Sequence, residues 1–165
     1  DAASKPGPTK GDRGQLYREF WTRYLDRVGR EHPEWPNPRT PPPKSWLPAK
    51  GPLPGSMLMP LFRSAGRLGH DLYIDTGNAA DNLSLFEELR SQRDSIEEAY
   101  GGRLEWLELP GRRACRVADE TQGSVDQVEH HEKYVSWLIE RGERMRRALQ
   151  AVGTTSDDQA RRPSP

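Results

Sequence analysis

The chain has 165 residues, the length of a single domain with its own core. Its 25 basic and 25 acidic side chains give a formal net charge of zero at pH 7, which excludes a whole-chain attraction to nucleic acid or to an acidic membrane surface. Cys115 is the only cysteine, so we expect no intrachain disulfide. No apolar run approaches the ~20 residues of a membrane span, and the first residues do not resemble the apolar core of a signal peptide. We therefore expect a cytoplasmic protein without a membrane partner.

The first part of the chain divides into three predicted segments. Residues 1–12 are rich in Lys, Pro, Gly and Asp, and we expect a disordered linker that follows a preceding domain. From Arg13 to Arg30, apolar side chains recur every four positions, which predicts an amphipathic helix. Residues 32–43 contain six prolines and are expected to form a stiff connector rather than a docking ligand.

Three segments then have the composition of short strands: 45–50, 56–63 and 70–75. Pro48 and Pro60 have no amide N–H, so the first two segments belong at a sheet edge or contain bulges. The third alternates cleanly and is predicted to be central, with Leu72 and Ile74 facing the core. Its other face carries three polar or aromatic positions: Asp71, Tyr73 and Asp75. We interpret residues 66–69 as a hairpin turn and not as a phosphate-binding loop.

A helix followed by a hairpin is predicted next. Asn78 is the predicted cap of a helix that ends at Tyr100 before two glycines. Its predicted buried stripe consists of Leu83, Phe86, Leu89, Ile96 and Tyr100. Residues 103–109 and 112–118 flank the turn Pro110-Gly111 and are expected to pair as two strands.

The last element is predicted as a long amphipathic helix over residues 124–152. The residues of its predicted apolar face recur at spacings of three and four: Val128, His131, Val135, Leu138, Gly142, Met145, Leu149 and Val152. His131 and Gly142 suit a coiled coil poorly, which favours packing on the domain's own sheet. Residues 153–165 are expected to be a disordered tail.

These elements define one α+β domain over residues 13–152. It comprises an N-terminal helix, an antiparallel sheet interrupted by an inserted central helix, and a long C-terminal helix, with the helices covering one face of the sheet.

Several motifs of this domain match a known pattern in order and spacing: Lys44-Ser45-Trp46, residues 71–77 (DLYIDTG), 86–89 (FEEL), Ile96-Glu97, 104–106 (LEW), 112–117 (RRACRV) and Trp137. Together they resemble a bacterial and archaeal family of domains of unknown function over roughly Leu16 to Val152. The family commonly forms the C-terminal portion of proteins with PD-(D/E)XK nuclease-like domains. The resemblance implies a setting in DNA metabolism or defence, with no catalytic residues to carry over.

Two groups of side chains raise the question of a metal site. Four carboxylates lie on or beside predicted strands, as in divalent-metal nucleases: Asp71, Asp75, Glu105 and Glu108. The lysine that PD-(D/E)XK sites place two residues after an acid is missing, which favours ion pairing or capping. His130 and His131 are adjacent on a helix and point apart, so we expect a solvated helix start. Cys115 is predicted to be a small core residue. We therefore predict no catalytic residue, metal ion or cofactor.

Basic residues on strands and turns offer the main candidate site. Six arginines and two aromatic residues could share one sheet surface suited to phosphate binding and base stacking: Arg63, Arg67, Arg103, Arg112, Arg113, Arg116, Tyr73 and Trp106. The alternative is that these arginines pair with strand carboxylates.

The leading hypothesis is a non-catalytic accessory or recognition domain of a nuclease-associated bacterial protein, which binds DNA, a protein partner or the preceding domain of the same chain. A divergent metal-dependent nuclease is the first alternative. An oligomerisation module that uses the C-terminal helix is the second.

Overall fold

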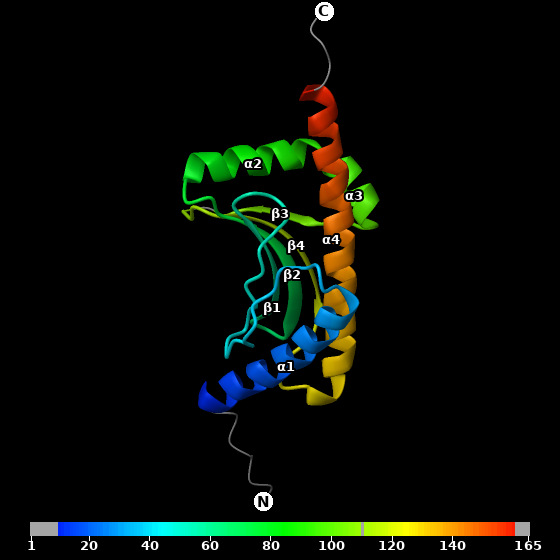
Figure 1. The fold of residues 1–165 in the computed structure, drawn as a ribbon. Helices are drawn as coiled ribbons and strands as arrows, with labels where there is room; N and C mark the ends of the chain where they lie inside the picture. Colours follow the sequence, from blue (N-terminus) through cyan, green and yellow to red (C-terminus); the bar gives the residue numbers. More distant parts are fainter. Residues whose placement is uncertain (1–9, 110, 161–165) are drawn as a thin grey trace, which may run out of the picture.

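The computed structural model describes residues 10–109 and 111–160, and describes side chains for 11–109 and 111–152. Within this part of the chain, four strands form one antiparallel sheet in the order β1-β2-β4-β3, and four α-helices lie on one side of it (Figure 1). In chain order the elements are α1 (Lys10–Glu31), β1 (Ser56–Arg63), β2 (Arg67–Ile74), α2 (Ala79–Ser91), α3 (Arg93–Tyr100), β3 (Glu105–Glu108), β4 (Cys115–Gln122), the 3₁₀ turn η1 (Val128–His130) and α4 (His131–Ala160). The predicted α+β class is confirmed.

Strands β1 and β2 form a hairpin at one edge of the sheet. Ala65 has φ 61° and Gly66 has φ 67°, so the two residues make the left-handed turn that a short hairpin loop needs. The turn therefore comprises residues 64–66, and Gly69, expected in the turn, lies within β2. Strand β2 pairs with β1 and β4, which confirms that it is central.

The segment over residues 45–51 runs along the outer side of β1 without forming a continuous strand. It makes isolated bridges, Trp46 with Leu61 and Lys50 with Met57. Between them, the carbonyl of Pro60 accepts a hydrogen bond from the amide of Leu47 at 2.9 Å, but Pro60 has no N–H to return one. The prediction that residues 45–50 and 56–63 belong at a sheet edge is confirmed, because β1 is an edge strand of the sheet and residues 45–50 lie outside it.

The predicted central helix is two helices, because the chain bends at Gln92 (φ −106°, ψ 20°) between α2 and α3. The Asn78 cap is confirmed: its side chain accepts a hydrogen bond from the amide of Asp81 at 3.0 Å. Leu83 was predicted to be buried and is exposed. Asn82 faces the sheet instead, and its side chain bonds Thr76 and the carbonyl of Arg113.

The hairpin after α3 is confirmed with shifted bounds. Strand β3 pairs with the first half of β4, from Glu105 opposite Ala118 to Glu108 opposite Cys115. Strand β4 begins at Cys115 rather than at residue 112, so Arg112 lies in the connecting loop. Pro110, half of the predicted turn, lies outside the described residues.

Helix α4 begins at His131, seven residues after the predicted start, because residues 124–130 form turns that include η1. Val128 is therefore exposed and not part of the buried face. The helix continues to Ala160, where a disordered tail was expected from Gly153. Packing within the domain is confirmed, since α4 contacts α1, α3 and β2.

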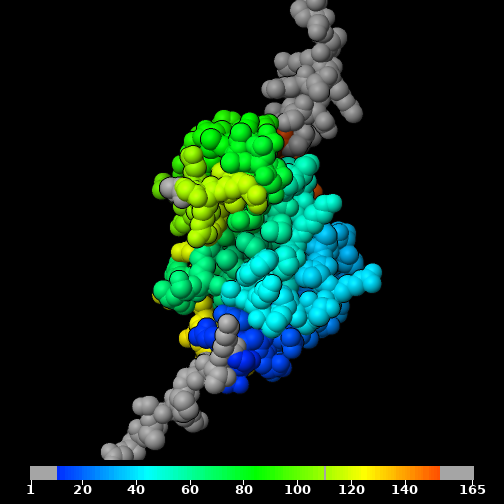
Figure 2. Space-filling model, turned by 90° about the vertical axis from the view of Figure 1, so that its left-hand side faces the viewer, coloured from blue at the N-terminus to red at the C-terminus, as the bar shows by residue number. Residues whose placement is uncertain are grey.

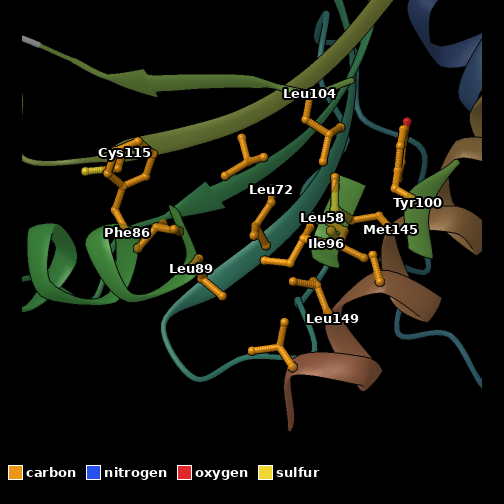
Figure 3. Packing of buried hydrophobic residues seen from close by; sticks show 14 residues of the cluster. Leu58, Leu72, Phe86, Leu89, Ile96, Tyr100, Leu104, Cys115, Met145 and Leu149 are labelled. Atoms are coloured by element: carbon orange, nitrogen blue, oxygen red, sulfur yellow. The ribbon is translucent and has the colours of Figure 1, made fainter. Parts of the chain in front are cut away.

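The core lies between the helices and the sheet in two clusters. One joins α2, α3 and the second half of α4 to the sheet, and Figure 3 shows Phe86, Leu89, Ile96, Leu72 and Met145 converging there. The other cluster joins α1 and the first half of α4 to the end of the β1–β2 hairpin. The whole core therefore sits on one face of the sheet, and the other face is free to carry a site.

Candidate functional site

The candidate site is the sheet face that no helix of the described chain covers, which we call the open face. Side chains alternate along a strand, and cross-strand partners share a face. The open face consists of Trp46, Met57, Met59, Leu61, Arg63, Arg67, Gly69, Asp71, Tyr73, Glu105, Leu107, Arg116, Ala118, Glu120 and Gln122. Figure 1 shows the sheet curving away from α4, and Figure 2 looks at this side, where segments near residues 40–75 meet those near 105–120.

One end of the open face is an apolar hollow of about 380 Å³, lined by Trp46, Met57, Met59, Leu61 and Tyr73. All five side chains are half-buried. A cation borders the hollow, because the Nζ atom of Lys44 lies 5.3 Å from the ring centroid of Trp46. The hollow is thus an exposed aromatic and methionine surface with a basic rim.

Beside the hollow, two arginines cover a buried carboxylate. Arg63 Nη2 donates to both Asp71 oxygens at 2.5 and 2.6 Å, and Arg116 Nε lies 3.5 Å from Asp71 Oδ2. The Asp71 side chain is fully buried, whereas the two arginine side chains are 17% and 22% exposed. Burial raises the pKa of Asp71, and the two guanidinium groups oppose that rise.

The backbone of β2 makes room for this cluster at Gly69. A Cβ atom at that position would collide with the guanidinium group of Arg63, so only glycine lets Arg63 lie across the strand. A third ion pair extends the network, with Arg67 Nε donating to Glu120 Oε1 at 3.2 Å. The arginines of the open face therefore already have carboxylate partners.

The structure brings together four of the eight predicted site residues, namely Arg63, Arg67, Tyr73 and Arg116. The other four lie elsewhere. Arg113 pairs with Asp75 at 2.8 Å beyond the end of β2. Arg103 and Arg112 are exposed in loops, with no charged partner among the described residues.

Trp106 lies on the opposite, helix-covered face. Its ring centroid lies 6.2 Å from that of Phe86, and its Nε1 donates a hydrogen bond to Glu97 Oε1 at 3.2 Å. It cannot form one aromatic surface with Tyr73, as the sequence had suggested. Its face depends on the register of β3 against β4, which pairs it with Val117.

Sequence reasoning missed the apolar half of the site, which includes Trp46, Met57, Met59 and Leu61. The signal was present, because 57, 59 and 61 alternate with the buried residues Leu58, Pro60 and Phe62. A strand that is apolar on both faces, in a sheet with helices on only one, marks an exposed apolar surface.

The residues considered for a metal site are dispersed. Glu105 and Glu108 are exposed on the edge strand, and Asp71 is held by arginines. Among the side chains of residues 11–109 and 111–152, no group of three His, Cys, Asp or Glu gathers in a way that could hold an ion. Cys115 is buried in the core as predicted, and burial raises the pKa of its thiol.

His131 was expected both on the apolar face of the last helix and in its solvated start, and it is buried, with Nε2 2.7 Å from the carbonyl of Val125. Phe20 of α1 packs edge-on against this ring, with the ring centroids 5.0 Å apart. His131 is thus a core residue of the helix start, and of the two histidines only His130 is exposed.

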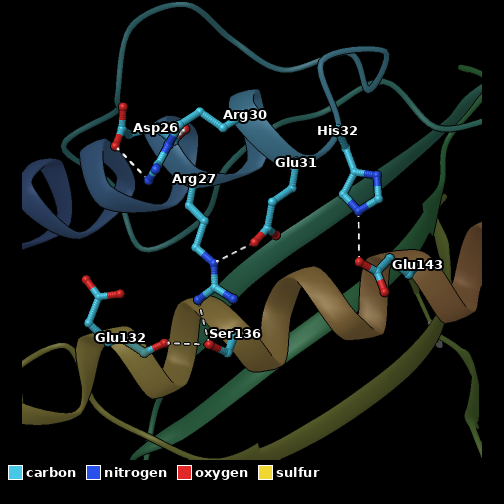
Figure 4. Close-up of polar contacts among 8 residues, drawn as sticks. All are labelled: Asp26, Arg27, Arg30, Glu31, His32, Glu132, Ser136 and Glu143. Atoms are coloured by element: carbon cyan, nitrogen blue, oxygen red, sulfur yellow. Dashed lines mark hydrogen bonds and ion pairs between the residues drawn. The ribbon is translucent and has the colours of Figure 1, made fainter.

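A separate polar cluster fastens the proline-rich connector to α4. His32 stacks on Trp35 with ring centroids 3.9 Å apart, and its ring nitrogens face Glu143 at 2.8 Å and Glu34 at 3.3 Å. Figure 4 shows His32 reaching Glu143 on α4, while Arg27 of α1 bonds Ser136. Burial acts to lower the pKa of His32, but the hydrogen bonds to the two glutamates outweigh it and the pKa is raised.

The fold and its open face define a class: an α+β domain whose helices cover one side of an antiparallel sheet. Within that class the chain belongs to the family described as Domain of unknown function (DUF4268), which matches residues 16–152. The predicted membership of an unknown-function family is confirmed. No match was found among curated proteins or among solved structures. No helix in the described part of the chain has the length and apolar composition needed to cross a membrane.

Proposed function

We propose that this domain is a non-catalytic recognition module of a nuclease-associated bacterial protein and that it binds a protein surface through its open face. The observation that carries the proposal is the apolar hollow around Trp46, Met59 and Tyr73 on a sheet face without helices. The bound surface belongs to a partner protein or to another domain of the same protein.

The composition of the open face supports protein recognition. Aromatic residues, methionine and arginine are enriched in the buried centres of protein interfaces, and Trp, Tyr and Arg dominate their binding energy. The open face combines Trp46 and Tyr73 with two methionines and the arginines of the Asp71 cluster. An apolar partner surface with an acidic edge would fill the hollow and meet Lys44 at its rim.

Binding of single-stranded DNA on the same face is the second candidate. It is favoured by the half-buried rings of Trp46 and Tyr73, whose accessible faces offer base-stacking surface next to arginines. The pairing of Arg63, Arg67 and Arg116 with carboxylates weighs against it, since a phosphate would have to displace Asp71 or Glu120. Arg103 and Arg112, whose charges are uncompensated within the described chain, lie off the open face.

Photo-crosslinking separates these candidates. A benzophenone side chain would replace Met59 in the hollow, and the matched control would carry it at Val128, which is 43% exposed beside η1. In cells that express the protein, the proposal predicts covalent protein adducts at position 59 that position 128 does not give. Nucleic-acid adducts at position 59 would support the DNA candidate. Equal labelling at both positions would contradict both.

A further inference from the structure

The outer edge of β4 is only half covered. Strand β4 has eight residues, and β3 pairs with the first four, Cys115–Ala118. Residues 119–122 have no strand on their outer side in the described chain. The amide of Gly123 donates to the carbonyl of Gly66 at 2.8 Å, and backbone direction alternates along a strand, so the backbone groups of Glu120 and Gln122 point outward.

A hollow of about 400 Å³ lies directly beside this free edge, between Thr121 of β4 and Tyr134 and Trp137 of α4. The aromatic wall is held in place, because the guanidinium group of Arg141 lies 5.2 Å from the Trp137 ring and 3.5 Å from Asp119. Here two aromatic side chains form one wall of the hollow, and Arg67, Glu120, Gln122 and Lys133 form a polar rim around it. An unpaired strand edge beside pockets for alternate side chains is the arrangement by which proteins capture extended peptides.

The charges around this hollow are unequal. Glu120 is paired with Arg67, and Asp119 with Arg141. Lys133 also lines the hollow, and it has no charged partner among the described residues. One positive charge therefore remains uncompensated, and a bound segment with an acidic side chain would complement it.

We propose that this edge binds an extended, acidic peptide segment of a partner protein as an added strand. The segment would run antiparallel to β4, in line with β3, and would exchange backbone hydrogen bonds with Glu120 and Gln122. Its residue opposite Thr121 points to the helix side and enters the hollow against Tyr134 and Trp137, so it is apolar. A neighbouring acidic residue meets Lys133. This edge lies two strands away from β1, so the inference is independent of the apolar hollow on the open face.

The test uses a displayed library of random seven-residue peptides, selected on the folded protein, followed by fluorescence anisotropy with a synthetic copy of the selected peptide. Gln122→Pro removes the outward N–H, which bonds no other strand, and should weaken binding at least tenfold. The matched control Gln122→Thr keeps that N–H and should change the affinity less than twofold. Lys133→Glu should weaken binding of an acidic peptide at least fivefold.

A second measurement remains valid even if the proline variant does not fold. Methyl groups on alternate peptide nitrogens should abolish binding to the parent protein in one phase of the alternation and spare it in the other, because only alternate amides face β4. The proposal is overturned if no peptide is selected, if Gln122→Pro binds as tightly as the parent, or if methylation has no alternating effect. It is equally overturned if light scattering shows that the parent is a dimer and that Gln122→Pro is a monomer, because the edge would then pair two copies of the chain.

Discussion

Replacing Phe86 with Ala tests the packing of α2 on the sheet. The Phe86 side chain is fully buried in the cluster that contains Leu72, Ile74 and Cys115, and its ring lies 6.2 Å from that of Trp106. Truncating a buried phenylalanine loses its transfer free energy and leaves a cavity, so the free energy of unfolding should fall by about 3–5 kcal/mol. That loss is a large part of the stability of a domain of this size.

Leu83 provides the matched control, because it lies three residues earlier on α2 and is 38% exposed. Leu83→Ala should change the free energy of unfolding by less than about 0.5 kcal/mol. Urea denaturation of both variants, followed by circular dichroism at pH 7, measures the two effects with the same baseline. A loss below about 1 kcal/mol for Phe86→Ala, or an equal loss for Leu83→Ala, would refute the orientation of α2.

Three further predictions concern the polar interior and the open face. Burial lowers the pKa of His70 to about 3, so below pH 6.5 the unfolded state binds a proton that the folded state does not. Between pH 7 and pH 5 the free energy of unfolding of the parent should therefore fall by about 2 kcal/mol more than that of His70→Gln. The pKa of His32 is raised, so its contribution has the opposite sign: urea melts of the parent and His32→Gln should differ more at pH 5.5 than at pH 8.5. Gly69→Ala should displace Arg63 and cost about 1–3 kcal/mol, whereas Gly29→Ala, in open space on α1, should stabilise by up to about 1 kcal/mol. An equal pH dependence of each histidine variant and the parent, or a neutral Gly69→Ala, would contradict these assignments.

The parts of the fold that depend on local signals could be predicted from the sequence. Helical periodicity located α1, strand alternation located β2, and the Asn78 cap and Gly101 marked helix ends. Proline chemistry placed residues 45–50 at an edge. These features depend on neighbours in the chain, so composition and spacing carry them.

The errors arise where distant segments decide the outcome. The chain bends at Gln92, and Leu89 of α2 and Ile96 of α3 enter the same core cluster. The apolar periodicity of the segment does not reveal this bend. Asn82 displaced Leu83 from the buried face because the loop at residue 113 offers its side chain a partner. Tertiary contacts override local pattern at such positions.

The candidate site was predicted in part for the same reason. Arg63, Arg116 and Tyr73 share a face because β2 lies between β1 and β4, an order that the sequence does not state. The aromatic contribution came from Trp46, in a segment that pairs with β1 only at isolated bridges, rather than from Trp106. A residue's face can be inferred within one strand, but the neighbours it meets depend on strand order and register.

One affinity tests the central claim most directly. It is the affinity for the protein partner captured by the benzophenone at position 59, measured by titration calorimetry with the parent and with Tyr73→Ala. An interface centred on the apolar hollow predicts at least a tenfold loss of affinity for Tyr73→Ala and, for the parent, a negative heat-capacity change with little dependence on salt. An affinity within twofold of the parent's, or binding that falls steeply with salt as phosphate contacts do, would contradict protein recognition by the open face.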